Sequence, residues 1–376
     1  MKKSFKLITV LGIPVEINYS WFIIFGLVVY TLAVYYFPSP SIAPDLSPST
    51  YWIMAVISAV LLFACLLLHE LSHSYIAKIN QLPISGITLF IFGGVAHLEK
   101  EPDNPGIEFR MAAAGPLMSI FLGTLFFLLN IVLYSFVTSR ILYVITDYLS
   151  LLNFAVAIFN LIPGFPLDGG RLLRAAIWHF SGDLRRATFI ASSIGKGVAI
   201  IMIALGFFAF IMGSILSGLW FIFLGFFLME AAETSYRQMR MKKILSSVKI
   251  QNLMTKNVIT VPVSITLDRL VEDYFFKFRF ASFPVFENDT LMGLVTFHDI
   301  KEVGRENWHL TEAKKIMTPI RDDLLARKDD DLMEAMVKII NNGVGRLLVI
   351  EDHKLIGILS QKDIIRLFEF KEEIGE

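Results

Sequence analysis

Three residues in an apolar stretch have the spacing of a metal site: His69, Glu70 and His73, in the segment HELSH. Helix positions four apart lie on one face, so the two imidazoles could share a metal ion while Glu70 reaches its water molecule. The chemistry that this pattern predicts is hydrolysis with zinc, with Glu70 as the general base. The alternative is a helix end whose polar residues only meet water, because so short a motif also arises by chance.

Two imidazoles leave a catalytic zinc ion one protein ligand short. Asp168 is the best further candidate, in the segment FNLIPGFPLDGG, where prolines and glycines interrupt an apolar run. Irregular backbone at membrane depth must be buried in protein or line a wet cavity. Taken alone, Asp168 is equally well explained by an ordinary Asp-Gly turn. Glu230, Glu233 and Asp147 remain rival ligands.

Composition places much of the chain in a membrane. Of its 376 residues 55% are hydrophobic and 33 are Phe, which is more apolar surface than a soluble protein of this length can hide. Residues 244–376 hold 18 of the 34 Lys+Arg and 22 of the 34 Asp+Glu, so we expect a soluble part after a membrane part. Cys65, the sole cysteine, excludes an intrachain disulfide. The net charge of zero gives no reason to expect nucleic acid as a partner.

Six apolar runs are long enough to cross about 30 Å of hydrocarbon. They lie near residues 19–37, 51–78, 110–136, 141–160, 187–212 and 215–233. With both termini in the cytoplasm, only Arg140 among the basic residues of this part lies outside, as the positive-inside rule requires. The start of the fifth run is left open, because Lys196 lies within it. HELSH would lie about two to three helical turns from the cytoplasmic end of its span at Lys78.

The stretch 84–99, ISGITLFIFGGVAHLE, is rich in β-forming residues and is predicted to be a hairpin that turns at Gly93-Gly94. A free edge of this hairpin could bind a substrate as an added strand. The alternative is a hairpin that only packs.

The segment 112–119, AAAGPLMS, is rich in small residues. Small residues at the start of a span predict close helix packing. A role in shaping the catalytic cavity is the second interpretation.

Residues 244–376 contain an internal duplication with a period of about 64 residues. Three pairs match between the copies: Met254 with Met317, Gly293 with Gly357, and Asp299 with Asp363. Each copy alternates β-rich runs with amphipathic stretches. We therefore expect an α/β pair whose copies bury their apolar faces against each other.

HELSH in one span and NLIPGFPLDG in a later one together resemble the two signatures of the site-2 protease family of intramembrane metalloproteases. The resemblance covers most of residues 1–235. It implies a transmembrane protein as the substrate. The residues it implies are the zinc ligands His69, His73 and Asp168, the catalytic acid/base Glu70, and Asn160 as a hydrogen-bond partner of the scissile carbonyl or its oxyanion.

The repeated unit resembles a pair of cystathionine-β-synthase-type (CBS) domains, many of which bind adenine nucleotides between the copies. Thr296 with Asp299, and Ser360 with Asp363, match the pattern that grips ribose in that family, and the second copy matches better. The resemblance implies ATP, ADP or AMP as a regulatory ligand and the pair as a candidate homodimer interface. The same pattern is also an ordinary helix cap, so a purely structural or dimerising module is the alternative.

These features predict a polytopic α-helical membrane protein with six transmembrane helices, a membrane-associated β-hairpin and a soluble α/β CBS-domain pair. The predicted parts are a transmembrane metalloprotease domain at 1–236, a basic linker at 237–248, and CBS domains at 249–308 and 309–376. The predicted function is intramembrane zinc-dependent proteolysis in the cell membrane, in contact with lipid. The active site opens to the cytoplasm, where nucleotide bound to the CBS pair would control access.

Two rival classes remain. A CBS-regulated transporter or channel would show inverted repeats among its spans, and the sequence shows no such symmetry. A different HExxH membrane protease would take Glu230 or Glu233 as its third ligand.

Overall fold

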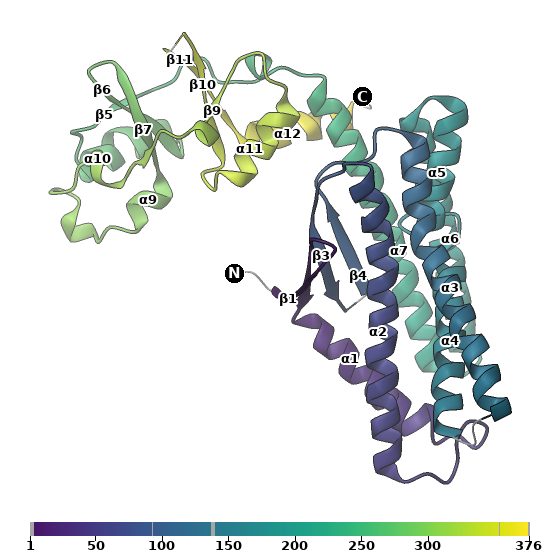
Figure 1. The fold of residues 1–376 in the computed structure, drawn as a ribbon. Helices are drawn as coiled ribbons and strands as arrows, with labels where there is room; N and C mark the ends of the chain where they lie inside the picture. The colour runs from purple at the N-terminus through teal and green to yellow at the C-terminus, as the bar shows by residue number, and fades with distance from the viewer. Residues whose placement is uncertain (1–3, 92, 137–139, 353, 375–376) are drawn as a thin grey trace. The chain divides into compact units, whose positions relative to one another are not determined.

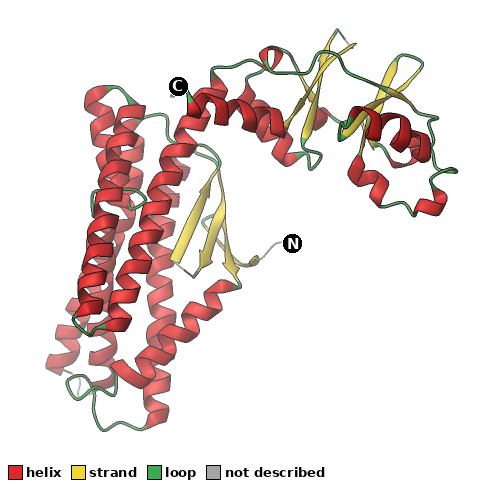
Figure 2. Ribbon diagram, turned by 180° about the vertical axis from the view of Figure 1, so that it is seen from behind, coloured by secondary structure: helices red, strands yellow, loops and turns green. Residues whose placement is uncertain are grey.

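The computed structural model describes residues 4–91, 93–136, 140–352 and 354–374. The chain divides into two compact units, Met1–Arg237 and Gln238–Glu376. The first unit is helical with one small sheet, and the second combines short strands with short helices (Figures 1 and 2). Each unit has hydrophobic clusters of its own.

Five helices among the described residues are long and apolar enough to cross a membrane. They are α2 (Pro48–Ile79), α3 (Pro105–Phe136), α4 (Arg140–Asn160), α6 (Leu184–Ile211) and α7 (Ile215–Ser246). In each helix, less than half of the most apolar window is buried inside the protein. The remaining apolar side chains form large exposed surfaces of the kind that lipid covers.

The first apolar run forms a shorter helix than expected. α1 (Ser20–Thr31) continues as a π-helical segment, Leu32–Tyr36, and prolines follow at positions 38 and 40. The stretch Ser20–Tyr36 spans about 26 Å at 1.5 Å per residue, which is less than the roughly 30 Å of a hydrocarbon core. The structure therefore supports five spans, and the sixth predicted span is not confirmed.

A four-stranded sheet lies beside α2, in the order β1-β2-β3-β4 (Figure 1). Its strands are β1 (Ser4–Val10), β2 (Ile13–Asn18), β3 (Ile84–Phe90) and β4 (Gly93–Leu98). β2 runs parallel to β3, and the other neighbours are antiparallel. Ile13 of β2 and Ile87 of β3 are buried together with Leu71 of α2. The sheet therefore packs against the helix that carries HELSH.

The predicted hairpin at 84–99 is present, but the prediction of its turn is wrong. Phe90 pairs with Gly93, so the chain turns before Gly93, and residue 92 lies outside the described residues. Both glycines of the predicted turn belong to β4. A Cβ on Gly94 would lie 2.5 Å from Cγ of Glu70, so the glycine serves a close approach of this strand to α2.

The irregular segment after α4 leads into α5 (Asp168–Ser181), an amphipathic helix that the sequence analysis did not predict. Two glycines follow Asp168 where backbone meets backbone. A Cβ on Gly169 would lie 2.4 Å from the carbonyl oxygen of Leu161, and one on Gly170 would lie 2.3 Å from the carbonyl carbon of Gly164. The glycines therefore let the segment fold back onto the start of α5.

The second unit consists of two halves, each with its own sheet. The strands are β5 (Val261–Pro262), β6 (Ser282–Glu287), β7 (Thr290–Thr296) and β8 (Thr318–Pro319) in one sheet, and β9 (Leu325–Ala326), β10 (Arg346–Glu351) and β11 (Lys354–Ser360) in the other. The helices are α8 (Leu267–Arg269) with a π-helical continuation Leu270–Phe276, α9 (Phe297–Lys301), α10 (Ala313–Ile316), α11 (Leu332–Asn341) and α12 (Gln361–Glu373). Short 3-10 turns lie at Ile250–Asn252, Arg305–Asn307 and Asp322–Leu324.

The hairpins β6–β7 and β10–β11 show the duplication in detail. Ser282 pairs with Thr296 in the first, and Arg346 pairs with Ser360 in the second, at the positions that the repeat predicts. Both hairpins also shift register at the same place, directly after Val285 and after Val349. A shared irregularity of this kind indicates one structural unit used twice.

The repeated methionines and glycines meet across the two halves. A Cβ on Gly357 would lie 2.5 Å from Sδ of Met254, and one on Gly293 would lie 3.0 Å from Sδ of Met317. The start of each repeat therefore packs on the hairpin of the other. The two copies thus contact each other at these positions, while each half keeps a hydrophobic cluster of its own.

Candidate metal centre

Three donor atoms from two helices meet in the first unit. His69 and His73 lie four residues apart on α2, and their Nε2 atoms are 3.2 Å apart. Oδ2 of Asp168, the first residue of α5, lies 3.2 Å from each of them. Among the described residues, these three side chains are the group that could hold a metal ion together. The imidazoles are buried, with 4% of His69 and 8% of His73 exposed.

The spacing of these atoms fits a tetrahedral zinc ion. Zinc–ligand bonds of about 2.0–2.1 Å at tetrahedral angles place ligand atoms about 3.3 Å apart, close to the 3.2 Å found here. Two imidazoles and one carboxylate are also a donor set of catalytic zinc sites, where the fourth position stays open for water or substrate. The residues present therefore fit the metal.

Hydrogen bonds from α3 orient both imidazoles. Nδ1 of His73 lies 2.6 Å from the carbonyl oxygen of Met111. A carbonyl only accepts, so Nδ1 donates its proton there and the Nε2 lone pair stays free for a metal. Nδ1 of His69 lies 2.8 Å from Oγ of Ser119, a buried hydroxyl that can accept the corresponding proton. One helix thus sets the direction of both Nε2 atoms.

Gly115 of α3 keeps the space beside the donors open. A Cβ at this position would lie 2.1 Å from Nε2 of His73 and 2.5 Å from Nε2 of His69. These values are close to metal–ligand bond lengths, so a methyl group would compete with a metal ion for space. The small-residue segment 112–119 therefore shapes the cavity, which was the second of the two interpretations from the sequence.

Asp168 is positioned by the irregular segment before it. The backbone N–H of Phe165 donates to the carbonyl of Ala191 on α6 at 3.2 Å, and that of Leu167 donates to the carbonyl of Gly164 at 3.0 Å. These bonds satisfy polar backbone that lipid could not satisfy. At the first position of α5, the carboxylate of Asp168 also interacts favourably with the positive end of the helix dipole.

Glu70 lies beside the donors. It follows His69 on α2, is half-buried, and interacts electrostatically with both imidazoles and with Asp168. Its side chain faces β4, where Gly94 leaves room for it. A carboxylate next to a metal centre but outside the donor set can exchange a proton with water at the open position.

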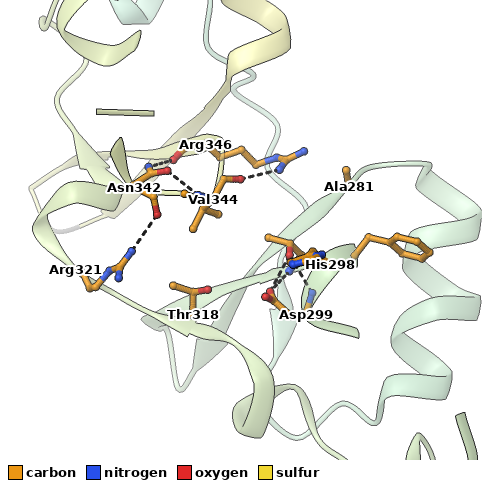
Figure 3. A pocket seen from close by; sticks show the side chains of 11 residues that line it. Ala281, His298, Asp299, Thr318, Arg321, Asn342, Val344 and Arg346 are labelled. Carbon is orange, nitrogen blue, oxygen red and sulfur yellow. Dashed lines mark hydrogen bonds between the residues drawn. The ribbon is translucent and has the colours of Figure 1, made fainter. Parts of the chain in front are cut away.

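A second candidate site is a cavity of about 500 Å³ in the second unit (Figure 3). His298 and Asp299 lie on one side of it, and Arg321 and Asn342 lie on the other (Figure 3). Thr296 and Arg346 also line the cavity. A cavity of this volume suits a small molecule of drug or cofactor size.

The hydroxyl and acid pairs predicted to grip ribose form helix caps in both copies. Oγ1 of Thr296 donates to Oδ2 of Asp299 at 2.9 Å, and Oγ of Ser360 donates to Oδ2 of Asp363 at 2.6 Å. Capping, the alternative reading of the sequence, therefore holds for both pairs. Thr296 and Asp299 also line the cavity, and Ser360 and Asp363 are not part of its lining.

Comparisons with known proteins match stretches in both units. The family model of peptidase family M50 matches residues 57–149 and 135–205, and that of the CBS domain matches residues 250–306 and 313–369. A zinc metalloprotease of Methanocaldococcus jannaschii is 34% identical over 382 residues, which cover 100% of both chains. This chain belongs to the site-2 protease family.

A second curated protein and a solved structure are also similar to this chain. The protein Rip3 of Mycobacterium tuberculosis is 31% identical over 98% of this chain and 94% of its own length. The solved structure of the site-2 protease from Methanocaldococcus jannaschii is 32% identical and covers 62% of this chain and 95% of its own, with a TM-score of 0.42. As a member of this family, the chain is an integral membrane zinc metalloprotease with a C-terminal CBS pair.

The structure of the present chain brings together the three residues that its sequence predicts as zinc ligands. Asn160, predicted to contact the substrate, is the last residue of α4 and begins the irregular segment that leads to Asp168. None of the hydrogen bonds among the described residues joins Asn160 to the three donors. Its role therefore stays a prediction.

The rival ligands lie outside the donor group of the described residues. Glu233 of α7 forms an ion pair with Lys196 of α6, while Asp147 and Glu230 are exposed. The ion pair also explains how Lys196 is accommodated within the fifth apolar run, because ionisable groups in a membrane pair with one another.

Sequence reasoning missed three residues of the centre. Met111 acts through its carbonyl, which any residue could supply, so no sequence signal marks it. Ser119 and Gly115 lie in the segment of small residues, and that segment was the available signal. Their contacts with α2 join residues about 40 to 50 positions apart, and only the fold reveals them.

Proposed function

We propose that this zinc metalloprotease hydrolyses peptide bonds within or near transmembrane segments of membrane proteins. The observation that carries the proposal is the placement of two of the three donors, His69 and His73, on α2, a helix apolar enough to cross a membrane. His69 lies ten residues before the end of α2 at Ile79, about 15 Å along the helix axis. A substrate must reach that depth to be cleaved, and a transmembrane segment does so.

In this proposal His69, His73 and Asp168 hold zinc, and Glu70 is the catalytic acid/base. When bound, zinc would supply Lewis-acid polarisation of the scissile carbonyl and acidify a water molecule. Glu70 takes a proton from the attacking water and returns it to the leaving amine. Asn160 donates a hydrogen bond to the scissile carbonyl, and its place at the start of the segment that carries Asp168 supports this role.

The substrate binds as an extended strand along β4. In the described sheet β4 is an edge strand, with β3 as its one neighbour. An unpaired edge offers backbone groups to an incoming segment, and a helical substrate must unwind to expose its carbonyls. Gly94 lies on this strand against Glu70, so a strand added to β4 would pass near the catalytic carboxylate.

The topology that we propose has six crossings in the cell membrane, both termini in the cytoplasm and an active site open to that side. Lys78 lies in the last turn of α2 and Lys243 in the last turn of α7, as expected at cytoplasmic ends. The stretch Ser20–Tyr36 is the sixth crossing, which a short helix achieves by local thinning of the bilayer.

A cysteine accessibility experiment tests this topology in a Cys65→Ala background. Ser49→Cys lies in the first turn of α2, at the end predicted to be external, and Lys256→Cys lies in the second unit. An impermeant thiol reagent added to intact cells should label the first cysteine and spare the second. Labelling of Lys256→Cys in intact cells would overturn the proposed orientation.

We further propose that the cavity of the CBS pair binds ATP, ADP or AMP and that this binding regulates cleavage. Arg346 supports an anionic ligand, because it lines the cavity and takes part in none of the ion pairs of the described residues. Burial lowers the pKa of Arg346, and the nearby Asp363 opposes that shift. A phosphate would stabilise its charged form, while Thr296 and Asp299 would face the ribose hydroxyls.

The proteolytic function is tested by cleavage of a model transmembrane substrate by purified full-length protein. Glu70→Gln should bind zinc as the wild type does and cleave about 10²- to 10⁴-fold more slowly, the usual range for loss of a general base. Asp168→Ala should lose zinc affinity. Wild-type cleavage by Glu70→Gln, or undiminished zinc affinity in Asp168→Ala, would contradict the assignments. Equally fast cleavage of a soluble loop peptide would contradict the substrate class.

A further inference from the structure

A buried ion pair joins α3 to α5 outside the donor group. Glu108 lies in the first turn of α3, and none of its surface is exposed. Arg174 lies on α5, with 6% of its side chain exposed. Nε of Arg174 donates to Oε1 of Glu108 at 2.6 Å, and Nη2 of the same guanidinium contacts the same oxygen. The other oxygen of Glu108, Oε2, is buried and has no hydrogen-bond partner among the described residues.

The pair is poorly explained by stability alone. Two charges that leave water lose their hydration. Apolar side chains of similar volume often stabilise a fold equally well or better. One carboxylate oxygen without a partner increases that loss. Buried ion pairs do fix the relative position of the elements that carry them, because a shifted partner leaves a charge uncompensated. The pair is therefore suited to holding α5 in place against α3.

With the Glu108–Arg174 ion pair, all three donor residues are connected to α3. Glu108 precedes Met111, which accepts the hydrogen bond of His73, by one turn of α3. Ser119, further along the same helix, contacts His69. Asp168 is the one donor without such a contact to α3, and it lies six residues before Arg174 on α5. The ion pair connects α5, which carries Asp168, to α3.

Arg174 also contacts the segment that precedes Asp168. Its guanidinium lies 4.9 Å from the centre of the Phe165 ring, within the range of cation–π attraction. Phe165 is buried, three residues before Asp168. The arginine thus restrains both the helix that begins at Asp168 and the turn that leads into it.

We propose that Glu108 and Arg174 are a positioning pair that holds Asp168 at bonding distance for the metal shared with His69 and His73. The proposal rests on the assignment of Asp168 as a zinc ligand. Neither residue belongs to the donor group of the described residues. Their effect on catalysis passes through the geometry of the third ligand.

The test compares zinc affinity of full-length protein, measured by competition with a chromophoric chelator, in two backgrounds. In the wild-type background, Glu108→Gln should weaken zinc binding at least tenfold. In the Asp168→Ala background, the same substitution should cause no further loss, because the ligand that it positions is gone. A general loss of structure would weaken zinc binding in both backgrounds, so equal losses would overturn the proposal.

Arg174→Lys gives a second, milder variant in case Glu108→Gln does not fold. It keeps the charge but loses the planar fork and its stacking on Phe165, so zinc affinity should fall by a smaller factor. The cobalt-substituted Arg174→Lys protein should also show a changed visible absorption spectrum, which reports the coordination geometry directly. An unchanged spectrum together with unchanged zinc affinity would overturn the proposal.

Lys196→Gln is the matched control. Its ion pair with Glu233 joins α6 to α7 and includes neither α3 nor α5, so zinc affinity should stay at the wild-type value. A loss equal to that of Glu108→Gln would show that any ion pair of this unit matters alike and would refute a specific positioning role. Unchanged zinc affinity in Asp168→Ala would refute the ligand assignment itself, which separates that failure from failure of the pair.

Discussion

Gly115 contributes to the metal centre by having no side chain. Gly115→Ala should reduce zinc affinity by at least about a hundredfold, the upper range for changes around a metal centre. The added methyl group would lie 2.1 Å from Nε2 of His73, where it competes with the metal. Alanine favours a helix over glycine by about 0.5–1 kcal/mol, so α3 itself should persist. Metal analysis of the purified variant measures the loss.

Gly197→Ala is the control for this prediction. It also adds a methyl group to an apolar helix, but nothing lies within 4 Å of the new atom. Its zinc content should equal that of the wild type. Full zinc occupancy in Gly115→Ala would show that α3 moves away from the imidazoles and that the glycine is not required.

Ser119 accounts for the orientation of His69. Ser119→Ala should lower zinc affinity about tenfold, at the lower end of the 10- to 100-fold expected for the hydrogen-bond partner of a ligand, because the imidazole loses its acceptor but keeps its packing. Ser72→Ala removes a hydroxyl from α2 that donates to the carbonyl of Leu68 and should leave affinity unchanged. The prediction fails if chelator competition gives the same affinity for both variants.

At the residue scale, what the sequence revealed depended on distance along the chain. His69, Glu70 and His73 were found because helical periodicity alone brings them together. Asp168 lies almost 100 positions away. From the residues alone, a zinc ligand and an ordinary Asp-Gly turn explained it equally well, and its assignment came from the family resemblance. Its contact with the imidazoles needs α5, a helix that the sequence analysis did not predict.

β4 lies against Glu70, the proposed catalytic acid/base. Gly94→Ala should keep zinc affinity within about twofold and lower kcat by about a hundredfold, the loss that a small misplacement of a catalytic group can cause. The new Cβ would lie 2.5 Å from Cγ of Glu70 and would displace its carboxylate. Gly197→Ala adds a methyl group to α6, where nothing lies within 4 Å of the new atom, and should cleave normally.

The two parts of this prediction can fail separately. A normal kcat in Gly94→Ala would show that the strand yields to the added methyl group. A large loss of zinc would place the defect at the donors instead of at Glu70. Zinc analysis and cleavage rates from the same preparation distinguish these outcomes.

Helices were easier to predict than strands for a physical reason. A run of 20 or more apolar residues is a strong signal, and α2, α3, α4, α6 and α7 follow the predicted runs closely. The strands β1 and β2 precede the first run and have only six or seven residues each. The pairing of β2 with β3 joins positions about 70 apart, which no local pattern encodes. The turn was misplaced because glycine marks close approach as well as turns.

At the scale of the whole molecule, one covalent link joins the two units. The division between Arg237 and Gln238 falls within α7, and Leu245 near the end of that helix belongs to the core of the second unit. A change in that core can therefore act on α7 directly. In the proposed regulation, this connection would be the route from bound nucleotide to the protease unit.

Nucleotide binding should depend on the hydroxyl and acid pair of the first copy, Thr296 with Asp299. It should not depend on the corresponding pair of the second copy, Ser360 with Asp363. At 100 times its dissociation constant, ATP should stabilise the folded second unit by about 2.7 kcal/mol, seen as a rise in the melting temperature of the purified protein. Asp299→Ala should remove that rise, because Asp299 lines the cavity. Asp363→Ala, which removes a helix cap outside the lining, should lower the starting melting temperature but keep the shift on adding ATP.

Arg346→Gln should separate phosphate recognition from recognition of the nucleoside. It should weaken ATP binding by about tenfold or more, because a charged hydrogen bond to phosphate contributes about 1.5–3 kcal/mol, and it should leave adenosine binding nearly unchanged. Cleavage of the model substrate, measured with and without ATP, ADP and AMP, then shows whether binding regulates the protease. If none of the three changes either the melting temperature or the cleavage rate at millimolar concentration, the CBS pair of this protein is a structural module.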